Sequence, residues 1–163
     1  MRYAGLNKND MSAAPGVSVT FYTQGCPHHC KGCHNPETWD YNGGKEFTAD
    51  VVNEIIGALT KNGVVRTLSI MGGEPLCENN SFLVHMLISE VKRSLPDVKV
   101  YLWTGYYYED LTKRNDDRVN KILDIVDVLI DGPFVVEKRD ITLPMRGSSN
   151  QSVINLSEMR NNS

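Results

Sequence analysis

Short segments rich in β-branched and aromatic residues alternate along this chain with segments whose apolar residues recur at helical spacing. The expected strands are residues 16–23, 66–73, 99–105, 127–132 and 151–155. Parallel strands need long connections, which are usually helices, so helical segments between strands indicate a parallel arrangement. The alternation therefore predicts an α/β fold with a mostly parallel sheet of about five to six strands.

Three segments between these strands have the apolar spacing of helices. The first is expected to begin after an N-cap at Thr48 and to stop at residues 62–63, with one apolar stripe: Val51, Val52, Ile55, Ile56 and Leu59. The second covers residues 81–95, and the third covers about 109–126, although polar residues 115–117 weaken its middle. The final segment, SEMRNNS, is expected to be a frayed tail.

The length of the chain limits how complete the fold can be. With 163 residues and a mass of 18.3 kDa, it fits one domain spanning residues 1–163. A complete eight-unit βα barrel usually takes about 250 residues. We therefore expect a partial (βα) barrel that is open on one side.

The charge and hydropathy patterns exclude several classes of partner. Lysine and arginine total 17 against 20 acidic residues, and no basic tract indicates a nucleic-acid surface. No apolar run approaches the about 20 residues that span a bilayer, and the start has no signal-peptide pattern. We expect no nucleic acid, no membrane and a cytoplasmic location. In that reducing compartment, clustered cysteines favour metal binding or catalysis over disulfides.

Two unusual sequences follow the first two expected strands. CPHHCKGCH occupies residues 26–34, and MGGEPL occupies residues 71–76. In α/β proteins, the loops at the carboxyl ends of parallel strands form the functional site. These two sequences are therefore expected to lie together.

Cys26, Cys30 and Cys33 have the spacing CxxxCxxC, and thiolates favour iron-sulfur clusters or zinc over hard cations. A structural zinc site completed by one histidine, either His28, His29 or His34, is an alternative, as are three unligated thiols. Cys77 is a candidate fourth ligand, but its distance in sequence favours a lone thiol. A four-iron cluster held by three cysteines would leave one iron open to a substrate.

CxxxCxxC after the first strand and Gly72-Gly73-Glu74-Pro75 after the second resemble the radical S-adenosylmethionine superfamily. The resemblance implies that Cys26, Cys30 and Cys33 bind a 4Fe-4S cluster, whose fourth iron chelates the amino and carboxylate groups of S-adenosylmethionine. It also implies that residues 72–74 hold the methionine ammonium.

Physical arguments support a cofactor role for residues 72–74, although an ordinary strand-to-helix turn is the alternative. Glycines allow a sharp turn and close backbone approach to a ligand, and Glu74 adds a negative charge. Next to Cys33, Gly32 departs from the superfamily pattern, which commonly has an aromatic residue there. We expect His34 to supply the flanking ring, so Gly32, Cys33 and His34 are candidate cofactor-binding residues.

Four further segments resemble the activases of glycyl radical enzymes, especially the short ones that act on anaerobic ribonucleotide reductase. They are CHNPETWDYNGG (33–44), WTGY (103–106), DGPF (131–134) and RGSSNQ (146–151). Each has a structural alternative: Trp39 and Trp103 as core aromatics, residues 131–132 as a turn, and Arg146 as a solvated loop charge.

The resemblance implies an oxidoreductase that reductively cleaves S-adenosylmethionine and uses the 5′-deoxyadenosyl radical to form a glycyl radical. The implied partners are anaerobic ribonucleoside-triphosphate reductase and an external electron donor such as a flavodoxin-like protein. No side chain is expected to act as a catalytic acid or base. The alternatives are a radical enzyme acting on a small molecule and a non-catalytic metal-binding module.

Overall fold

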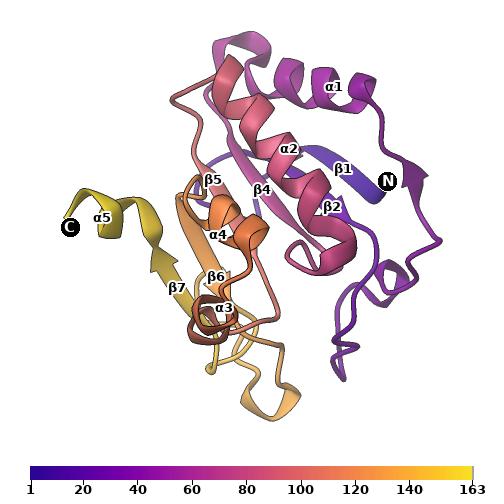
Figure 1. The fold of residues 1–163 in the computed structure, drawn as a ribbon, viewed down its shortest axis with the longest axis vertical. Helices are drawn as coiled ribbons and strands as arrows, with labels where there is room; N and C mark the ends of the chain where they lie inside the picture. Colours follow the sequence, from indigo (N-terminus) through magenta and orange to yellow (C-terminus); the bar gives the residue numbers. More distant parts are fainter. Residues whose placement is uncertain (163) are drawn as a thin grey trace.

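Four parallel strands form the centre of the sheet in this computed structural model, which describes residues 1–162 (Figure 1). In sheet order they are β2 (Ser18–Thr23), β4 (Thr67–Gly72), β5 (Val100–Trp103) and β6 (Val128–Asp131). All three pairings between them are parallel. The expected α/β class with a mostly parallel sheet is thus confirmed for the centre of the sheet.

Antiparallel strands extend both sides of this centre. β1 (Arg2–Asp10) pairs with β2, and the two-residue β3 (Lys45–Glu46) pairs with β1. On the opposite side, β7 (Ser152–Asn155) pairs with β6. The described sheet therefore has seven strands in the order β3-β1-β2-β4-β5-β6-β7, which is more than the five to six expected.

The two faces of the sheet differ in polarity because successive side chains of a strand point to opposite faces. One face carries fully buried apolar residues in register across the parallel strands: Val19, Phe21, Leu68, Ile70, Val100, Leu102 and Leu129. The opposite face carries small polar residues such as Thr20 and Ser69, with Met71 and Trp103 nearer the strand ends. The apolar face forms the core with the helices.

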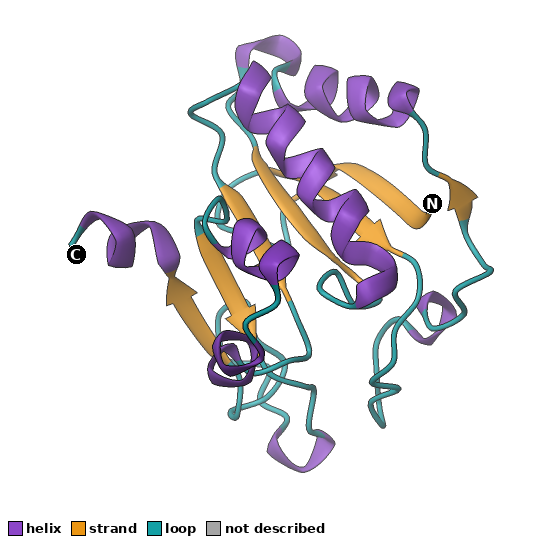
Figure 2. Ribbon diagram, viewed as in Figure 1, coloured by secondary structure: helices purple, strands orange, loops and turns teal. Residues whose placement is uncertain are grey.

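Helices α1 (Ala49–Leu59), α2 (Glu78–Ser94) and α4 (Asp117–Leu123) pack on the apolar face of the sheet, and Figure 2 shows α2 and α4 in front of the strands. The shorter helices are α3 (Tyr108–Arg114) and α5 (Leu156–Asn161). Three 3-10 turns cover Pro36–Thr38, Lys61–Gly63 and Val136–Lys138. As expected, α1 begins after Thr48, although that side chain makes no capping hydrogen bond.

Two helix expectations are wrong, and in both regions a side chain caps a new helix. The expected helix 109–126 is divided because Asn115 adopts a left-handed conformation and Asp116 accepts a hydrogen bond from the Val119 amide at 3.0 Å, which starts α4. The expected frayed tail, residues 157–163, is helical through Asn161, while Ser163 lies outside the described residues. At the start of this helix, Asn155 accepts a hydrogen bond from the Glu158 amide at 3.0 Å.

The loops that follow the parallel strands gather at one end of the molecule (Figures 1 and 2). They are the cysteine-containing loop after β2, the GGEP turn after β4, the WTGY segment after β5, and residues 132–151 between β6 and β7. No helix within residues 1–162 is long and apolar enough to cross a membrane.

Candidate iron-sulfur and cofactor site

A cavity of about 190 Å³ lies at the carboxyl ends of the parallel strands. All of its walls come from the loops just described and from the last residues of β4 and β5. Its lining includes Cys26, Cys30, Cys33, His34, Gly72, Gly73, Thr104, Gly105, Gly132, Phe134 and Gln151. The structure thus brings together the cysteine motif and the glycine turn, as the sequence predicted.

Backbone amides point toward the sulfur atoms of the cysteine motif. Burial raises the pKa of the Cys26 thiol to about 11, and hydrogen bonds from the backbone of His28 and His29 act in the opposite direction. Burial also raises the pKa of Cys30, opposed by a hydrogen bond from the backbone of Phe134. The amide of Asn35 donates to the sulfur of Cys33 at 3.3 Å. These donors favour the thiolate forms that bind metals.

The residues around the cysteines fit an anionic iron-sulfur group. Within residues 1–162, the indole N–H of Trp39 is buried without a hydrogen-bond partner, and Trp39 lines the same cavity. In that same range, no group of three His, Cys, Asp or Glu side chains is arranged to hold a single metal ion. A cluster differs from a single ion because its thiolate ligands bind separate irons, and nearby hydrogen-bond donors tune its potential.

Cys77 belongs to a different environment. It is buried at the start of α2, does not line the cavity, and accepts a hydrogen bond from the side chain of Tyr41. The structure therefore favours the expected lone thiol over a fourth ligand.

The segment after the third cysteine supports the cysteine-containing loop. The Gly25 amide donates to the Thr38 carbonyl at 2.6 Å, and the Gln24 side chain donates to the Asp40 carbonyl at 2.6 Å. The rings of His29 and Trp39 stack with their centroids 4.6 Å apart. Trp39 is only partly buried and lines the cavity, so its interpretation as a core aromatic is wrong.

The two glycines after β4 allow close contact between neighbouring backbones. Gly72 has a φ of +102°, and a Cβ there would lie 2.7 Å from the Thr23 nitrogen. A Cβ on Gly73 would lie 2.3 Å from the Gly25 carbonyl oxygen, which also accepts a hydrogen bond from the Glu74 amide at 2.8 Å. Both glycines line the cavity, but their closest neighbours are protein backbone rather than open space.

Glu74 is fully buried, and its carboxylate accepts four hydrogen bonds. Oε1 accepts from the Gly105 amide and from His28 Nε2, both at 2.6 Å. Oε2 accepts from the Leu76 amide and the Thr104 hydroxyl, both at 2.8 Å. No local pattern predicts these bonds, because the partners come from three segments of the chain: His28, Leu76, and the adjacent Thr104 and Gly105.

Gly32 and His34, the residues beside Cys33, lie against the loop after β6. Gly32 has a φ of +78°, and a Cβ there would lie 3.2 Å from the Phe134 ring. The ring centroids of His34 and Phe134 are 5.4 Å apart. Gly32 stands where the superfamily pattern commonly has an aromatic residue. The Phe134 ring, from a distant segment, thus packs beside that position.

The loop between β6 and β7 is held over the cavity by polar contacts. Gln151 Oε1 accepts from the amides of Gly147 at 2.8 Å and Ser148 at 3.1 Å, while its Nε2 donates to the Gly132 carbonyl at 2.9 Å. Trp103, which is also only partly buried, donates from its indole nitrogen to the Met145 carbonyl at 2.8 Å. The segments WTGY, DGPF and RGSSNQ therefore meet at this loop.

Asp131 is more than a turn residue, and Arg146 is not the solvated loop charge that the sequence alone allows. Asp131 is buried and accepts from the amides of Tyr108 at 2.8 Å and Ser152 at 3.0 Å, so it joins α3 and β7. Arg146 is partly buried, and among the described residues its Nε atom has no hydrogen-bond partner. It is therefore not a fully solvated loop charge.

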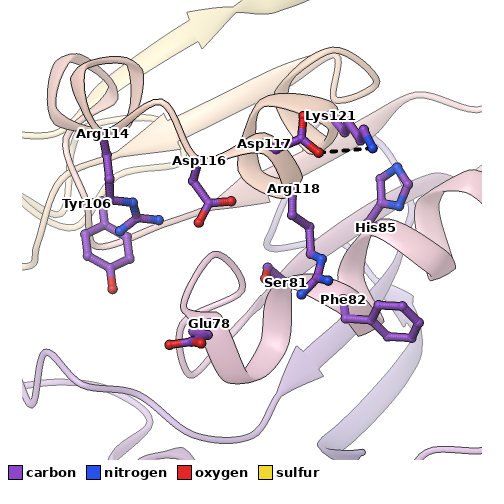
Figure 3. A pocket seen from close by; sticks show the side chains of 10 residues that line it. All are labelled: Glu78, Ser81, Phe82, His85, Tyr106, Arg114, Asp116, Asp117, Arg118 and Lys121. Atoms are coloured by element: carbon purple, nitrogen blue, oxygen red, sulfur yellow. Dashed lines mark ion pairs between the residues drawn. The ribbon is translucent and has the colours of Figure 1, made fainter.

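A larger cavity, of about 850 Å³, lies away from the cysteines between α2 and the α3–α4 region (Figure 3). It is an open polar cleft in which charges of opposite sign are mixed. Lys121 pairs with Asp117 at 3.1 Å, and the Arg118 guanidinium lies over the exposed Phe82 ring. Its lining carries both acidic residues (Glu78, Asp116, Asp117) and basic residues (Arg114, Arg118, Lys121), so its size alone does not make it the functional site.

Comparison with known proteins identifies the class and then the family. Residues 13–154 match the family described as a 4Fe-4S single cluster domain, so the chain is an iron-sulfur protein of this class. It is 37% identical over 154 residues to the anaerobic ribonucleoside-triphosphate reductase-activating protein of Vibrio cholerae, covering 94% of this chain and 97% of that protein. Proteins of the same name from Escherichia coli and Haemophilus influenzae are each 34% identical, over 96% and 94% of this chain and 99% and 97% of their own lengths. The chain belongs to the family of anaerobic ribonucleoside-triphosphate reductase-activating proteins.

Proposed function

We propose that this protein is a radical S-adenosylmethionine activase that generates a glycyl radical on anaerobic ribonucleoside-triphosphate reductase. One observation supports this most strongly: three cysteines with backbone N–H donors line the same cavity as the glycine turn after β4. The family supports a 4Fe-4S cluster and a reductase as the target, since the relatives are named for activating that enzyme.

Each candidate site residue has a distinct proposed role. Cys26, Cys30 and Cys33 hold the 4Fe-4S cluster, and residues 72–74 bind the methionine part of S-adenosylmethionine. Gly32 and His34 flank the cofactor. Because the Glu74 carboxylate is already bound by four donors, its contribution to binding is to hold the turn whose backbone faces the cavity.

Bound together, the cluster and S-adenosylmethionine supply one-electron reductive cleavage of the bond from sulfur to the 5′ carbon, giving methionine and a 5′-deoxyadenosyl radical. An external donor, such as a flavodoxin-like protein, provides the electron. With both groups bound, a glycine α-carbon of the reductase would be the hydrogen-atom donor, and 5′-deoxyadenosine would be the product. The protein's own residues position the reactants and exclude water, and no side chain acts as an acid or base.

The loop of residues 132–151 is the proposed contact with the reductase. It covers one side of the cavity and carries exposed residues, including Ile141, which is 83% exposed. A glycine loop from a large partner must reach the cavity from outside, and this loop supplies Gly132, Phe134 and Gln151 to the cavity wall. The substrate of the radical is therefore a polypeptide in this proposal, not a small molecule.

The direct test is an anaerobic assay with reductant, S-adenosylmethionine and the candidate reductase. A glycyl radical should appear in the electron paramagnetic resonance spectrum, together with methionine and 5′-deoxyadenosine. Cys30→Ser is the matched inactive control, because it removes one proposed cluster ligand. Release of 5′-deoxyadenosine that needs an added small molecule and leaves the reductase unmodified would contradict the activase role.

A further inference from the structure

His28 lies between two proposed cluster ligands in the chain, but its ring is bound to a different loop. Its Nε2 donates to Glu74 Oε1 at 2.6 Å, and its side chain is only 18% exposed. Because all the other partners of the Glu74 carboxylate are donors, the carboxylate acts as acceptor and His28 as donor. This contact joins the cysteine-containing loop to the GGEP turn through side chains.

The ring of His28 occupies a slot that depends on a missing side chain. A Cβ on Gly105 would lie 2.5 Å from His28 Cδ2 and 2.7 Å from Nε2, which is too close for any real contact. On another side, the ring meets Tyr106 edge-on, with centroids 4.5 Å apart. The loop after β5 is therefore shaped to hold this imidazole.

Glu74 extends this link from two loops to three. Its Oε1 is shared by His28 and the Gly105 amide, while its Oε2 binds the Leu76 amide. The cysteine-containing loop, the turn after β4 and the loop after β5 are thus joined at one fully buried carboxylate. A displacement of His28 would remove this side-chain link, and the cysteine-containing loop would remain joined to the turn after β4 only near its start, where the Gly25 carbonyl accepts from the Glu74 amide at 2.8 Å.

We propose that His28 is a positioning residue that fixes the cluster-binding loop relative to the turn that binds S-adenosylmethionine. The inference rests on the proposed function, because it concerns how the cluster-binding loop is placed relative to the turn that binds S-adenosylmethionine. His28 also lines the cavity, but its Nε2 is bound to Glu74, so its proposed role is to set the geometry in which the open iron and the cofactor meet. Small errors in such positioning are costly to catalysis.

The first experiment titrates S-adenosylmethionine into the reduced, cluster-loaded protein and follows the change in the electron paramagnetic resonance spectrum. His28→Ala should keep normal iron and sulfide content, because all three cysteines remain, but should need about tenfold more cofactor for half saturation. A tenfold change equals about 1.4 kcal/mol, near the lower end for a hydrogen bond to a charged group. The apparent KM should rise more than kcat falls. His85→Ala, which changes a histidine in the outer cleft, is the matched control.

Two further variants separate positioning from general damage. His28→Gln keeps an N–H donor at similar reach and should recover most of the affinity. Gly105→Ala leaves His28 intact but fills its slot, so it should weaken cofactor binding as His28→Ala does. Gly57→Ala is its control, since a Cβ there has no neighbour within 4 Å.

A readout without metal or cofactor is amide hydrogen exchange of the cluster-free protein. The Gly105 amide shares Glu74 Oε1 with His28 and should exchange faster in His28→Ala than in His85→Ala. If the wild type cleaves S-adenosylmethionine but His28→Ala matches His85→Ala in half saturation and exchange, the positioning role is overturned and the proposed function stands. If the wild type cleaves no S-adenosylmethionine, the proposed function fails and this inference fails with it.

Discussion

The buried carboxylate of Glu74 gives a sharp test of how the site is built. Glu74→Gln keeps the size of the side chain but replaces one oxygen by an NH2 group. Each carboxylate oxygen accepts from one backbone amide, Gly105 at Oε1 and Leu76 at Oε2, and from one group that can adapt. His28 can change tautomer and Thr104 can rotate its hydroxyl, but a backbone amide can only donate.

The size of the effect follows from this geometry. Whichever way the glutamine amide points, its NH2 group faces one backbone N–H, which loses its acceptor. A buried donor without a partner costs about 1 to 3 kcal/mol, and the remaining bonds lose the assistance of the negative charge. We therefore expect Glu74→Gln to lower the free energy of unfolding by about 2 to 4 kcal/mol. For a chain of this length, each kcal/mol corresponds to about 2 to 4 °C in Tm.

The measurement is urea unfolding of the cluster-free protein in reducing buffer, so that no cofactor contributes. Glu46→Gln, at an exposed position in β3, is the matched control and should change the free energy of unfolding by less than about 0.5 kcal/mol. If Glu74→Gln lowers the free energy of unfolding no more than the control does, the carboxylate is not held by these four donors. Its role would then have to be in direct cofactor binding.

Three other predictions concern the cluster, the partner and acid stability. Cys30→Ser should lose most iron while Cys77→Ser keeps it, as measured by iron and sulfide analysis after anaerobic reconstitution; the reverse result would reject the assigned ligands. Arg146→Ala should lower the glycyl radical yield more than cluster content or partner-free cleavage of S-adenosylmethionine, and loss of partner-free cleavage would place Arg146 in the cofactor site. Burial alone would raise the pKa of Asp10, but hydrogen bonds from Thr20 and Ser12 bring that pKa below its ordinary value. The free energy of unfolding should therefore fall as the pH drops from about 5 through that lowered pKa, and Asp10→Asn should make this fall shallower; equal slopes would contradict it.

The central strands and the location of the site could be predicted because both depend on local patterns. Each parallel strand is a short buried run, and a loop at its carboxyl end must lie at the same edge as its neighbours. The position of the cysteine motif beside the glycine turn therefore follows from the order of strands and loops in the sequence.

Features that depend on pairing or capping were not predicted. β1 carries Gly5, Lys8 and Asn9 and lacks β-branched residues, so nothing local indicates a strand; it forms through antiparallel pairing with β2. The division between α3 and α4 and the existence of α5 depend on asparagine and aspartate side chains at helix starts. Short polar residues of this kind are compatible with turns and helix caps alike.

The interpretation of the GGEP turn was incomplete for a different reason. Glycines that permit close approach do not reveal what approaches them. At Gly72 and Gly73, the nearest atoms belong to residues 22, 23 and 25, which lead into the cysteine-containing loop, and to Thr38, which follows it. Close packing of two protein segments gives the same sequence signal as an opening for a ligand.

The hydrogen bonds to the cysteines show why the motif alone cannot form this site. Cys26 and Cys33 accept N–H bonds from residues of their own loop, but Cys30 accepts one from the backbone of Phe134, after β6. The same Phe134 packs against Gly32 and lies beside His34. Because N–H donors to ligand sulfurs influence the potential of an iron-sulfur centre, the environment of the cluster-binding loop depends on a segment placed there by three parallel strand crossovers. A peptide containing CPHHCKGCH would keep the ligands and their local donors but would lack the Phe134 amide and the Glu74 link, so the whole sheet is needed to assemble the site.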